Sequence, residues 1–365
     1  MKIAFDYTIF MIQKYGGISR YFMELSKALS QDINCKIIAP ISINGHLNEV
    51  NQNLFNLKKL SKIPPYSTKL ITYSNFITSS IYMNLWKPDI IHKTYFNDHH
   101  YKSIKAKKIL NVWDLSHEIY PELYSKNKNW RPKKKSLELA DHVICSSHKT
   151  KNDLEKYYNF DLNKTSVVYQ GVNQSINPKN INYDKKKYLL YVGSRLKYKN
   201  FENLLRALSI NKQILDDFQL ICFGEEKINQ LEKDLIKSLG LNEKNILFIS
   251  GNDQKLHEHY LNATALIYPS KNEGFGFPPL EAMSFGCPVI SSNNTAILEA
   301  TNLPEYSFDP ELPKDIALKI ENIIYSKSNI NFLISHGLER IKNLSWKKTS
   351  QDALNVYKKI LNKLY

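Results

Sequence analysis

Short, mainly apolar runs of residues alternate with longer amphipathic stretches along most of the chain. Runs of this kind are typical of strands that are buried on both faces of a sheet. Because helical patterns separate them, they predict parallel sheets built from βαβ units. The strands expected from this pattern cover residues 2–5, 35–40, 89–93, 108–114, 142–147 and 166–171 in the first half, and 188–193, 218–224, 245–251, 265–270 and 288–292 in the second.

Two such series predict an α/β protein with two Rossmann-like, doubly wound domains. We expect the boundary after Val172, in the polar stretch 173–187, which gives domains of residues 1–172 and 173–345. The last segment, 346–365, has apolar residues at helical spacing and predicts a C-terminal helix. Ligands of open parallel sheets bind at the carboxyl ends of strands, so we expect the site in a cleft where the two sheets face each other.

Composition narrows the class of protein. The chain has 365 residues, enough for two α/β domains, and a hydrophobic content of 42%, which excludes a disordered protein. We find no apolar run of membrane-spanning length and no signal-peptide pattern at the start, so we expect a cytoplasmic protein. The four cysteines have no metal-ligand spacing and are expected to be buried, reduced thiols: Cys35, Cys145, Cys222 and Cys287.

The net charge of +15 leaves the kind of partner open. Lysines cluster at residues 102–108, 133–135 and 185–187. A basic surface attracts anionic lipid, nucleic acid or phosphorylated substrates, but solvated lysines account for the same clusters. No RNP-like run or zinc-finger spacing accompanies the charge, so no nucleic-acid partner is expected.

The segment 269–290 carries the strongest motif. Gly274 and Gly276 lie in a turn after a predicted strand, where the absence of side chains lets the backbone approach a ligand closely. The prolines at 278–279 suit the first turn of a helix, and Gly286 is typical of a helix end.

The predicted helix start suits a sugar nucleotide. Its unpaired N–H groups and the positive end of its dipole favour a diphosphate. Glu273 lies in the loop before the helix and Glu281 in its early turns, where both carboxylates can accept hydrogen bonds from hydroxyl groups. A helix that is capped by its own loop is the alternative. The ligand site is favoured because the strand, the glycine turn, the prolines at the helix start and the glycine at its end all occur together.

This segment resembles the Glu-x7-Glu motif of the retaining glycosyltransferases of family 4, which have the GT-B fold. The resemblance implies that Glu273 contacts hydroxyls of the donor sugar and that Glu281 contacts the ribose. It also implies that the last helix, 346–365, crosses back onto the first domain. Backbone amides that would meet the donor sugar and its phosphates belong to Gly274, Phe275, Gly276 and Phe277.

A second match follows the predicted strand 188–193. Gly193 ends the strand, and Arg195 and Lys199 lie in the loop before the next helix. The family has an Arg and a Lys here, the Lys followed by Asn or Gly, and the resemblance implies that the pair neutralises the diphosphate. Two solvated cations are the alternative, although cations are disfavoured at a helix start unless an anion binds.

Two weaker matches complete the predicted donor site. Gly16 and Gly17 precede a helix, and the family's Gly-Gly turn approaches the donor phosphate from the other domain. The same two residues also suit an ordinary turn. Ser250 follows the strand 245–251, where the nucleobase of the family packs against backbone.

The loop after strand 108–114 departs from the family pattern. Many members carry a His directly before Asp114, but this chain has Trp113. It resembles instead those relatives with aromatic-Asp-x-x-His-Glu, which makes Asp114 and His117 the predicted catalytic residues beside Glu273, with Glu118 orienting the acceptor. His117 as a partner for a loop carboxylate is the alternative.

The resemblance implies a retaining hexosyltransferase that needs no metal or other cofactor. The donor would be GDP-mannose or a UDP-sugar, with a mannosyltransferase-like character, and the acceptor a glycan or lipid-linked glycan of a surface polysaccharide such as lipopolysaccharide. The enzyme would work in the cytoplasm, with peripheral association at the inner face of the membrane as a further expectation.

Two other classes stay open on the sequence. Non-hydrolysing sugar-nucleotide epimerases share the two-domain architecture and would convert a donor in the absence of an acceptor. A non-enzymatic basic protein that binds anionic lipid or nucleic acid would account for the charge but not for the motif at 269–290.

Overall fold

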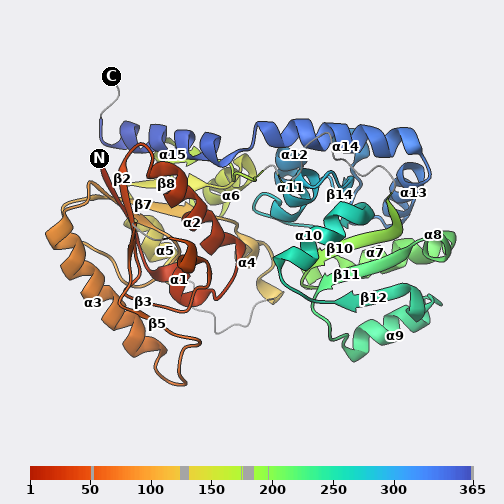
Figure 1. Ribbon diagram of the computed structural model, residues 1–365, viewed down its shortest axis with the longest axis horizontal. Coiled ribbons are helices and arrows are strands. Elements are labelled where there is room, and N and C mark those ends of the chain that lie inside the picture. The colour runs from red at the N-terminus through yellow and green to blue at the C-terminus, as the bar shows by residue number, and fades with distance from the viewer. Residues whose placement is uncertain (51–52, 124–130, 174, 176–184, 196, 363–365) are drawn as a thin grey trace. The chain divides into compact units, whose positions relative to one another are not determined.

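The chain folds into two compact units (Figure 1). The computed structural model describes residues 1–50, 53–123, 131–173, 175, 185–195 and 197–362. Unit 1 consists of Met1–Leu115, Tyr124–Gly171 and Trp346–Tyr365, and unit 2 of Ser116–Leu123 and Val172–Ser345. The short piece Ser116–Leu123 therefore packs with unit 2, although its neighbours along the chain belong to unit 1. The sequence did not predict this packing.

The predicted domain boundary can be compared with this division only in part. The polar stretch 173–187 lies mostly outside the described residues. In the described part of the chain, no helix combines the length and the apolar character needed to cross a bilayer.

Unit 1 is built on a parallel sheet with the strand order β4-β2-β1-β6-β7-β8-β9, as the apolar runs predict. In the register of the sheet, Ile3 lies between Cys35 and Ile90. Two very short strands pair separately. The strands are β1 (Lys2–Phe5), β2 (Asn34–Ile38), β3 (Ile41–Ser42), β4 (Leu54–Phe55), β5 (Lys58–Lys59), β6 (Ile90–Lys93), β7 (Lys107–Val112), β8 (His142–Cys145) and β9 (Thr165–Val167). The helices are α1 (Thr8–Ile12), α2 (Gly17–Leu29), α3 (Thr68–Trp86), α5 (Arg131–Glu138), α6 (His148–Tyr158) and α15 (Trp346–Ile360).

The C-terminal helix α15 packs into the core of unit 1, which confirms the predicted return to the first domain. The Tyr357 hydroxyl lies 2.8 Å from His92 Nδ1, and Asn111 Oδ1 lies 2.7 Å from His92 Nε2. Burial lowers the pKa of His92 to about 4, so the ring is neutral and its two nitrogens serve as one donor and one acceptor. This buried polar link fixes the helix to β6 and β7.

Unit 2 contains a second parallel sheet with the order β12-β11-β10-β13-β14. Its strands are β10 (Lys186–Gly193), β11 (Gln219–Gly224), β12 (Ile246–Ile249), β13 (Ala263–Tyr268) and β14 (Val289–Ser291). Its helices are α4 (Ser116–Ile119), α7 (Phe201–Ile210), α8 (Gln213–Asp217), α9 (Gln230–Ser238), α10 (Asp253–Asn262), α11 (Phe277–Ser284), α12 (Thr295–Thr301), α13 (Pro313–Ile324) and α14 (Lys327–Lys342). The second half of the chain thus has the predicted βαβ order.

All four cysteines are free and buried, which confirms the prediction for them. Burial raises the pKa of Cys35 to about 11 and that of Cys145 to about 12, so these thiols are protonated and inert at neutral pH. Two of the clustered lysines are also engaged within the fold. Lys133 is buried and covers the Phe96 ring at 5.0 Å, and Lys185 donates to the carbonyl of Leu261.

Candidate functional site

Two glycines lie side by side where β10 and β11 end. Gly193 and Gly224 are partners in the parallel register and have φ of 125° and 147°, values that an L side chain rarely adopts. A Cβ atom on Gly224 would lie 2.7 Å from the Gly193 carbonyl oxygen. The close approach of the two backbones sets the direction of both loops at this edge of the sheet.

The loop after β10 is tied to the loop after β13. Asn200 has φ of 61°, a left-handed conformation that Asn tolerates better than other non-glycine residues. Its amide donates to the carbonyls of Pro269 at 3.0 Å and Pro310 at 2.7 Å, and the N–H of Lys271 donates to Tyr198 at 2.8 Å. These buried contacts hold Lys199 and Glu273, one from each loop, in fixed positions.

Lys199, Glu273 and Tyr268 form one hydrogen-bonded cluster. The Lys199 amine donates to Glu273 Oε1 at 2.6 Å and to the Tyr268 hydroxyl at 3.3 Å, and that hydroxyl donates to the same carboxylate oxygen at 2.7 Å. The side chains of Lys199 and Glu273 are only 15% and 14% exposed. The structure therefore brings together two predicted donor-site residues and adds Tyr268, which the sequence analysis missed although it ends a predicted strand.

The cluster keeps its charges. Burial, the largest single influence, lowers the pKa of Lys199, but the charge and hydrogen bond of Glu273 act together with the neighbouring tyrosines to hold the pKa well above its ordinary value. Burial, and next the carboxylate of Glu273, raise the pKa of Tyr268, so its hydroxyl stays protonated and remains a donor. An ammonium and a carboxylate thus lie together at the carboxyl edge of the sheet. A bound donor would pair the ammonium with a phosphate and the carboxylate with sugar hydroxyls.

Helix α11 follows this cluster, as the motif predicts. Gly276 precedes the helix with φ of 117°, Pro278 lies in its first turn and Gly286 beyond its end has φ of 63°. Glu281 lies within the helix and is nearly buried beside Tyr260, whose pKa is raised by burial and by the charge of Glu281. The amides of residues 274–277 lie in the loop and at the helix start that directly follow Glu273, the geometry that favours an anion.

The hydrogen-bond partners of Arg195 differ from those of Lys199. Its Nε donates to Glu232 Oε1 at 2.7 Å, and its terminal nitrogens donate to the carbonyls of Glu225 and Lys227. The side chain is 3% exposed and covers the Phe248 ring at 4.9 Å. Glu232 belongs to the capping box of α9, a contact that loop spacing does not reveal, and the binding of a diphosphate by Arg195 stays a prediction.

Ser250 follows β12 in the same unit. Its hydroxyl donates to Glu226 Oε1 at 2.6 Å, and its carbonyl accepts from the Lys255 amine at 2.9 Å. These contacts join the loops after β11 and β12, so the predicted nucleobase position lies at the same carboxyl edge as Gly224.

The segment Ser116–Leu123 brings His117, a predicted catalytic residue, and Glu118, predicted to orient the acceptor, to unit 2. The Asn272 amide donates to the Ser116 hydroxyl at 2.9 Å in a buried contact, and Tyr120 stacks on Tyr198 with ring centroids 6.3 Å apart. Asn272 precedes Glu273 and Tyr198 precedes Lys199, so both contacts are made to the loops of the cluster. His117 and Glu118 lie between these two contacts and therefore at the edge that carries Lys199 and Glu273.

In unit 1, Trp113 lies where many family members have a histidine. It is buried, and its ring packs edge-on against Tyr21 at 4.7 Å and Phe22 at 5.9 Å between centroids. Its side chain is therefore a core element of unit 1. Asp114 follows it at the end of β7 and is half-buried. The catalytic roles predicted for Asp114 and His117 stay predictions.

A buried carboxylate that the sequence analysis missed ties two loops of unit 1. Asp6 accepts from the Thr94 amide and hydroxyl, each at 2.7 Å, and from the Thr8 hydroxyl at 2.6 Å. Asn97 donates to the same Thr8 hydroxyl. The loops after β1 and β6 are thereby fixed together at the carboxyl ends of their strands, where the chain leads into the segment before α2.

The N-terminus of α2 leaves space at Gly17, one of the two predicted phosphate-binding glycines. A Cβ on Gly17 would have no heavy atom within 4 Å, whereas one on Gly16 would meet the flexible side chain of Gln13. Neither glycine has a left-handed φ. Packing and backbone conformation therefore do not require a glycine at position 17, and a ligand that approaches the backbone is a specific reason for one.

Gly17→Ala is expected to leave stability unchanged or slightly higher, since Ala suits a helix better than Gly by up to about 1 kcal/mol. The activity should fall at least about tenfold, because the methyl group occupies the space in which a phosphate would approach the backbone. Thermal unfolding and kcat/KM of the purified variant measure the two effects. Full activity in a stable variant would remove Gly17 from the predicted site.

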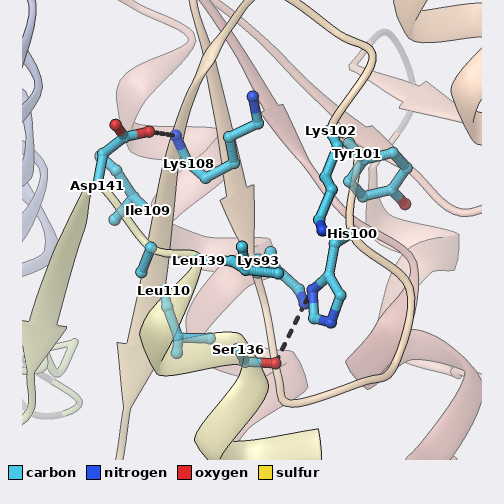
Figure 2. A pocket seen from close by; sticks show the side chains of 11 residues that line it. Lys93, His100, Tyr101, Lys102, Lys108, Ile109, Leu110, Ser136, Leu139 and Asp141 are labelled. Carbon is cyan, nitrogen blue, oxygen red and sulfur yellow. Dashed lines mark hydrogen bonds between the residues drawn. The ribbon is translucent and has the colours of Figure 1, made fainter.

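A separate cavity of about 440 Å³ lies within unit 1 (Figure 2). Its wall includes the buried Lys93, whose amine donates to Ser136 at 3.2 Å and lies 3.3 Å from His100 Nδ1. Burial lowers the pKa of Lys93 to about 8 and that of His100 to about 4. No predicted site residue lines this cavity, so it gives no support to the sugar-nucleotide site.

Comparison with protein families gives two adjoining matches. The model described as Glycosyltransferase Family 4 matches residues 15–175, and that described as Glycosyl transferases group 1 matches residues 172–335. Together they cover both units apart from the start of the chain and its last helices.

Individual relatives agree with the families. The chain is 30% identical over 230 residues to the O-antigen chain mannosyltransferase RfbU of Salmonella typhimurium, a match that covers 62% of this chain and 63% of that protein. It is 24% identical over 302 residues to the serotype-specific mannosyltransferase WbdA of Escherichia coli, covering 75% of this chain and 37% of the relative. The chain thus matches less than two thirds of the length of either protein.

Among solved structures, the sucrose-phosphate synthase of Thermosynechococcus elongatus superposes with a TM-score of 0.76 at 18% identity, over the whole of both chains. At this identity the likeness concerns the fold, which confirms the predicted arrangement of two Rossmann-like domains.

Proposed function

Because this chain belongs to glycosyltransferase family 4, we propose that it transfers a hexose from a nucleoside-diphosphate sugar, held by unit 2, to a hydroxyl group of a glycan. The observation that carries the proposal is the buried cluster of Lys199, Glu273 and Tyr268 directly before the start of α11. It offers a cation, a carboxylate and the amides of a helix start within one short stretch of the sheet edge.

Each group has a role in binding the donor. Lys199 neutralises the diphosphate, and the amides of residues 274–277 donate to its oxygens. Once Lys199 pairs with the phosphate, Glu273 accepts hydrogen bonds from the sugar hydroxyls. Tyr268 continues to donate to the carboxylate and holds it in place. Glu281, the second acidic residue of the motif, is assigned to the ribose.

The reaction breaks the bond between the anomeric carbon and the phosphate oxygen and forms a bond from that carbon to the acceptor oxygen. Lys199 and the helix amides stabilise the negative charge that develops on the departing nucleoside diphosphate, the main catalytic contribution. The acceptor attacks on the face that the phosphate leaves, so the anomeric configuration is retained, and the departing phosphate oxygen takes the hydroxyl proton. Asp114 and His117 act closest to the reacting groups, and Glu118 orients the acceptor.

Mannose is the proposed sugar and a surface polysaccharide the proposed product. The relatives that support this are named as mannosyltransferases, and RfbU as one that acts on O-antigen chains. GDP-mannose is therefore the first donor to test and UDP-sugars the next, with a lipid-linked glycan as acceptor.

A screen of nucleotide sugars by thermal shift tests the proposal. The expected result is a rise in unfolding temperature with one class of nucleoside-diphosphate sugar, since a ligand at a hundred times its Kd stabilises the folded state by about 2.7 kcal/mol. The stabilising donor is then incubated with and without acceptor. Conversion of the donor without acceptor would indicate an epimerase, and no stabilisation by any donor would contradict the proposal.

Transfer is expected to need no divalent metal, because Lys199 and the helix amides supply the positive charge at the diphosphate. An excess of EDTA should leave the initial rate unchanged. Loss of activity in EDTA that returns on addition of Mg²⁺ or Mn²⁺ would show that the leaving group depends on a metal.

A further inference from the structure

Helix α3 of unit 1 carries five large apolar side chains on its outer face. These residues follow one another at intervals of three or four positions, so they form a single stripe along the helix. The helix lies at the margin of unit 1 (Figure 1). Its members, with their exposed fractions, are Leu70 (70%), Tyr73 (55%), Ile77 (39%), Ile81 (59%) and Leu85 (79%).

The opposite face of the same helix packs on the core of unit 1 through the partly buried side chains of Ile71, Phe76, Tyr82 and Trp86. Asn75, Ser79 and Met83 are fully buried. The Asn75 side chain accepts from the N–H of Ile41 at 2.7 Å and donates to its carbonyl at 2.9 Å, which fixes the rotation of the helix. The stripe therefore faces away from the core because the inward face is specified by its own contacts.

The segment that contains the stripe has no acidic residue. The chain carries 35 Asp and Glu in 365 residues, about one in ten, yet residues 50–88 contain none and include five exposed lysines. Two further apolar side chains, Leu57 at 66% and Tyr66 at 105% exposure, lie in the same segment before the helix. The lysines are Lys58, Lys59, Lys62, Lys69 and Lys87.

We propose that this stripe docks on the surface of an anionic lipid bilayer, with α3 lying in the plane of the interface. The stripe from Leu70 to Leu85 is about 22 Å long at 1.5 Å per residue, and its leucine and isoleucine side chains enter the boundary between headgroups and acyl chains. Tyrosines suit the headgroup level, and the lysines at both ends pair with lipid phosphates.

Charge favours a bilayer over a second copy of the chain. In a symmetric dimer the stripe would face an identical stripe, which would place five lysines against five lysines with no carboxylate in the segment to pair with them. A bilayer rich in anionic lipid supplies the missing negative charge. The proposal does not depend on the donor site of unit 2, because all its residues belong to unit 1.

The test is flotation of the full chain with vesicles of phosphatidylcholine alone or with phosphatidylglycerol, at low and high salt. The test variant is Leu70→Asp with Leu85→Asp. The matched control, Leu231→Asp with Leu318→Asp, changes two leucines of unit 2 that are 81% and 55% exposed. All four side chains are exposed, so both variants should fold, which circular dichroism and gel filtration check.

The expected result is binding to the anionic vesicles that weakens with salt, at least about a tenfold loss of partitioning in the Leu70/Leu85 variant, and none in the control. Absence of binding by the natural chain, or equal binding by both variants, overturns the proposal. It is also overturned if gel filtration shows a dimer that the Leu70/Leu85 variant alone converts to a monomer, because the stripe then belongs to an interface between copies.

Discussion

Lys199→Met is expected to lower kcat/KM about a hundredfold. The substitution keeps most of the side-chain volume but removes the ammonium that would meet the diphosphate, and loss of one charged donor to a leaving group or oxyanion typically costs a factor of 10² to 10³. Tyr268 still donates to Glu273 at 2.7 Å, so the carboxylate keeps a partner and the fold should persist. Initial rates with the donor found by thermal shift measure the effect.

Lys271→Ala is the matched control for this variant. Lys271 lies in the same loop as Glu273, but its side chain pairs with the exposed Glu311. Such a surface ion pair contributes little to stability, typically below about 1 kcal/mol. Activity should therefore stay within about twofold of the natural chain. Equal rates for Lys199→Met and the natural chain would mean that Lys199 does not act on the leaving group.

Gly224→Ala is expected to destabilise unit 2 by about 3 kcal/mol. An alanine at φ of 147° is strained by roughly 1–3 kcal/mol, and its Cβ would lie 2.7 Å from the backbone carbonyl of Gly193, an atom that can move only with the strand end. The corresponding fall in unfolding temperature is roughly 5–10 °C. Calorimetry of the purified variant measures it, and donor binding should weaken as the loops after β10 and β11 separate.

Gly251→Ala provides the comparison at the same edge of the sheet. Gly251 has no left-handed φ, and a Cβ there would meet the Lys255 side chain, whose Cδ at 2.6 Å can turn away and whose Cβ at 3.0 Å needs a shift of a few tenths of an ångström. Its unfolding temperature should stay close to that of the natural chain. If Gly224→Ala proved as stable as Gly251→Ala, the close approach of Gly193 and Gly224 would not be a determinant of this edge.

Much of the fold follows from local pattern. The apolar runs predict the long parallel strands because a strand buried on both faces must be apolar throughout, and the proline and glycine signals at 278 and 286 bracket α11. What the pattern misses depends on contacts distant in sequence. Ser116–Leu123 packs with unit 2 through Asn272 and Tyr198, and the two-residue strands β3, β4 and β5 are too short to show a period.

For the candidate site, the sequence indicated some contacts and missed others. Motif spacing identified Lys199 and Glu273, which the structure joins in one ion pair. It did not reveal that Glu232, a helix-capping residue, would hold Arg195, because side-chain partners in a folded protein depend on the relative positions of loops. Tyr268 was overlooked because an aromatic residue in an apolar run is usually interpreted as a core residue. Its hydroxyl donates to Glu273 only because the residue lies at the strand end.

The central claim is that Lys199, Glu273 and the start of α11 form the pocket for a sugar diphosphate. A crystal structure of the chain with a bound nucleoside-diphosphate sugar tests it most directly. We predict the diphosphate within hydrogen-bonding distance of the Lys199 amine and the amides of residues 274–277, with the sugar against Glu273. Density for the diphosphate away from these groups, with Lys199 still paired to Glu273, would contradict the account.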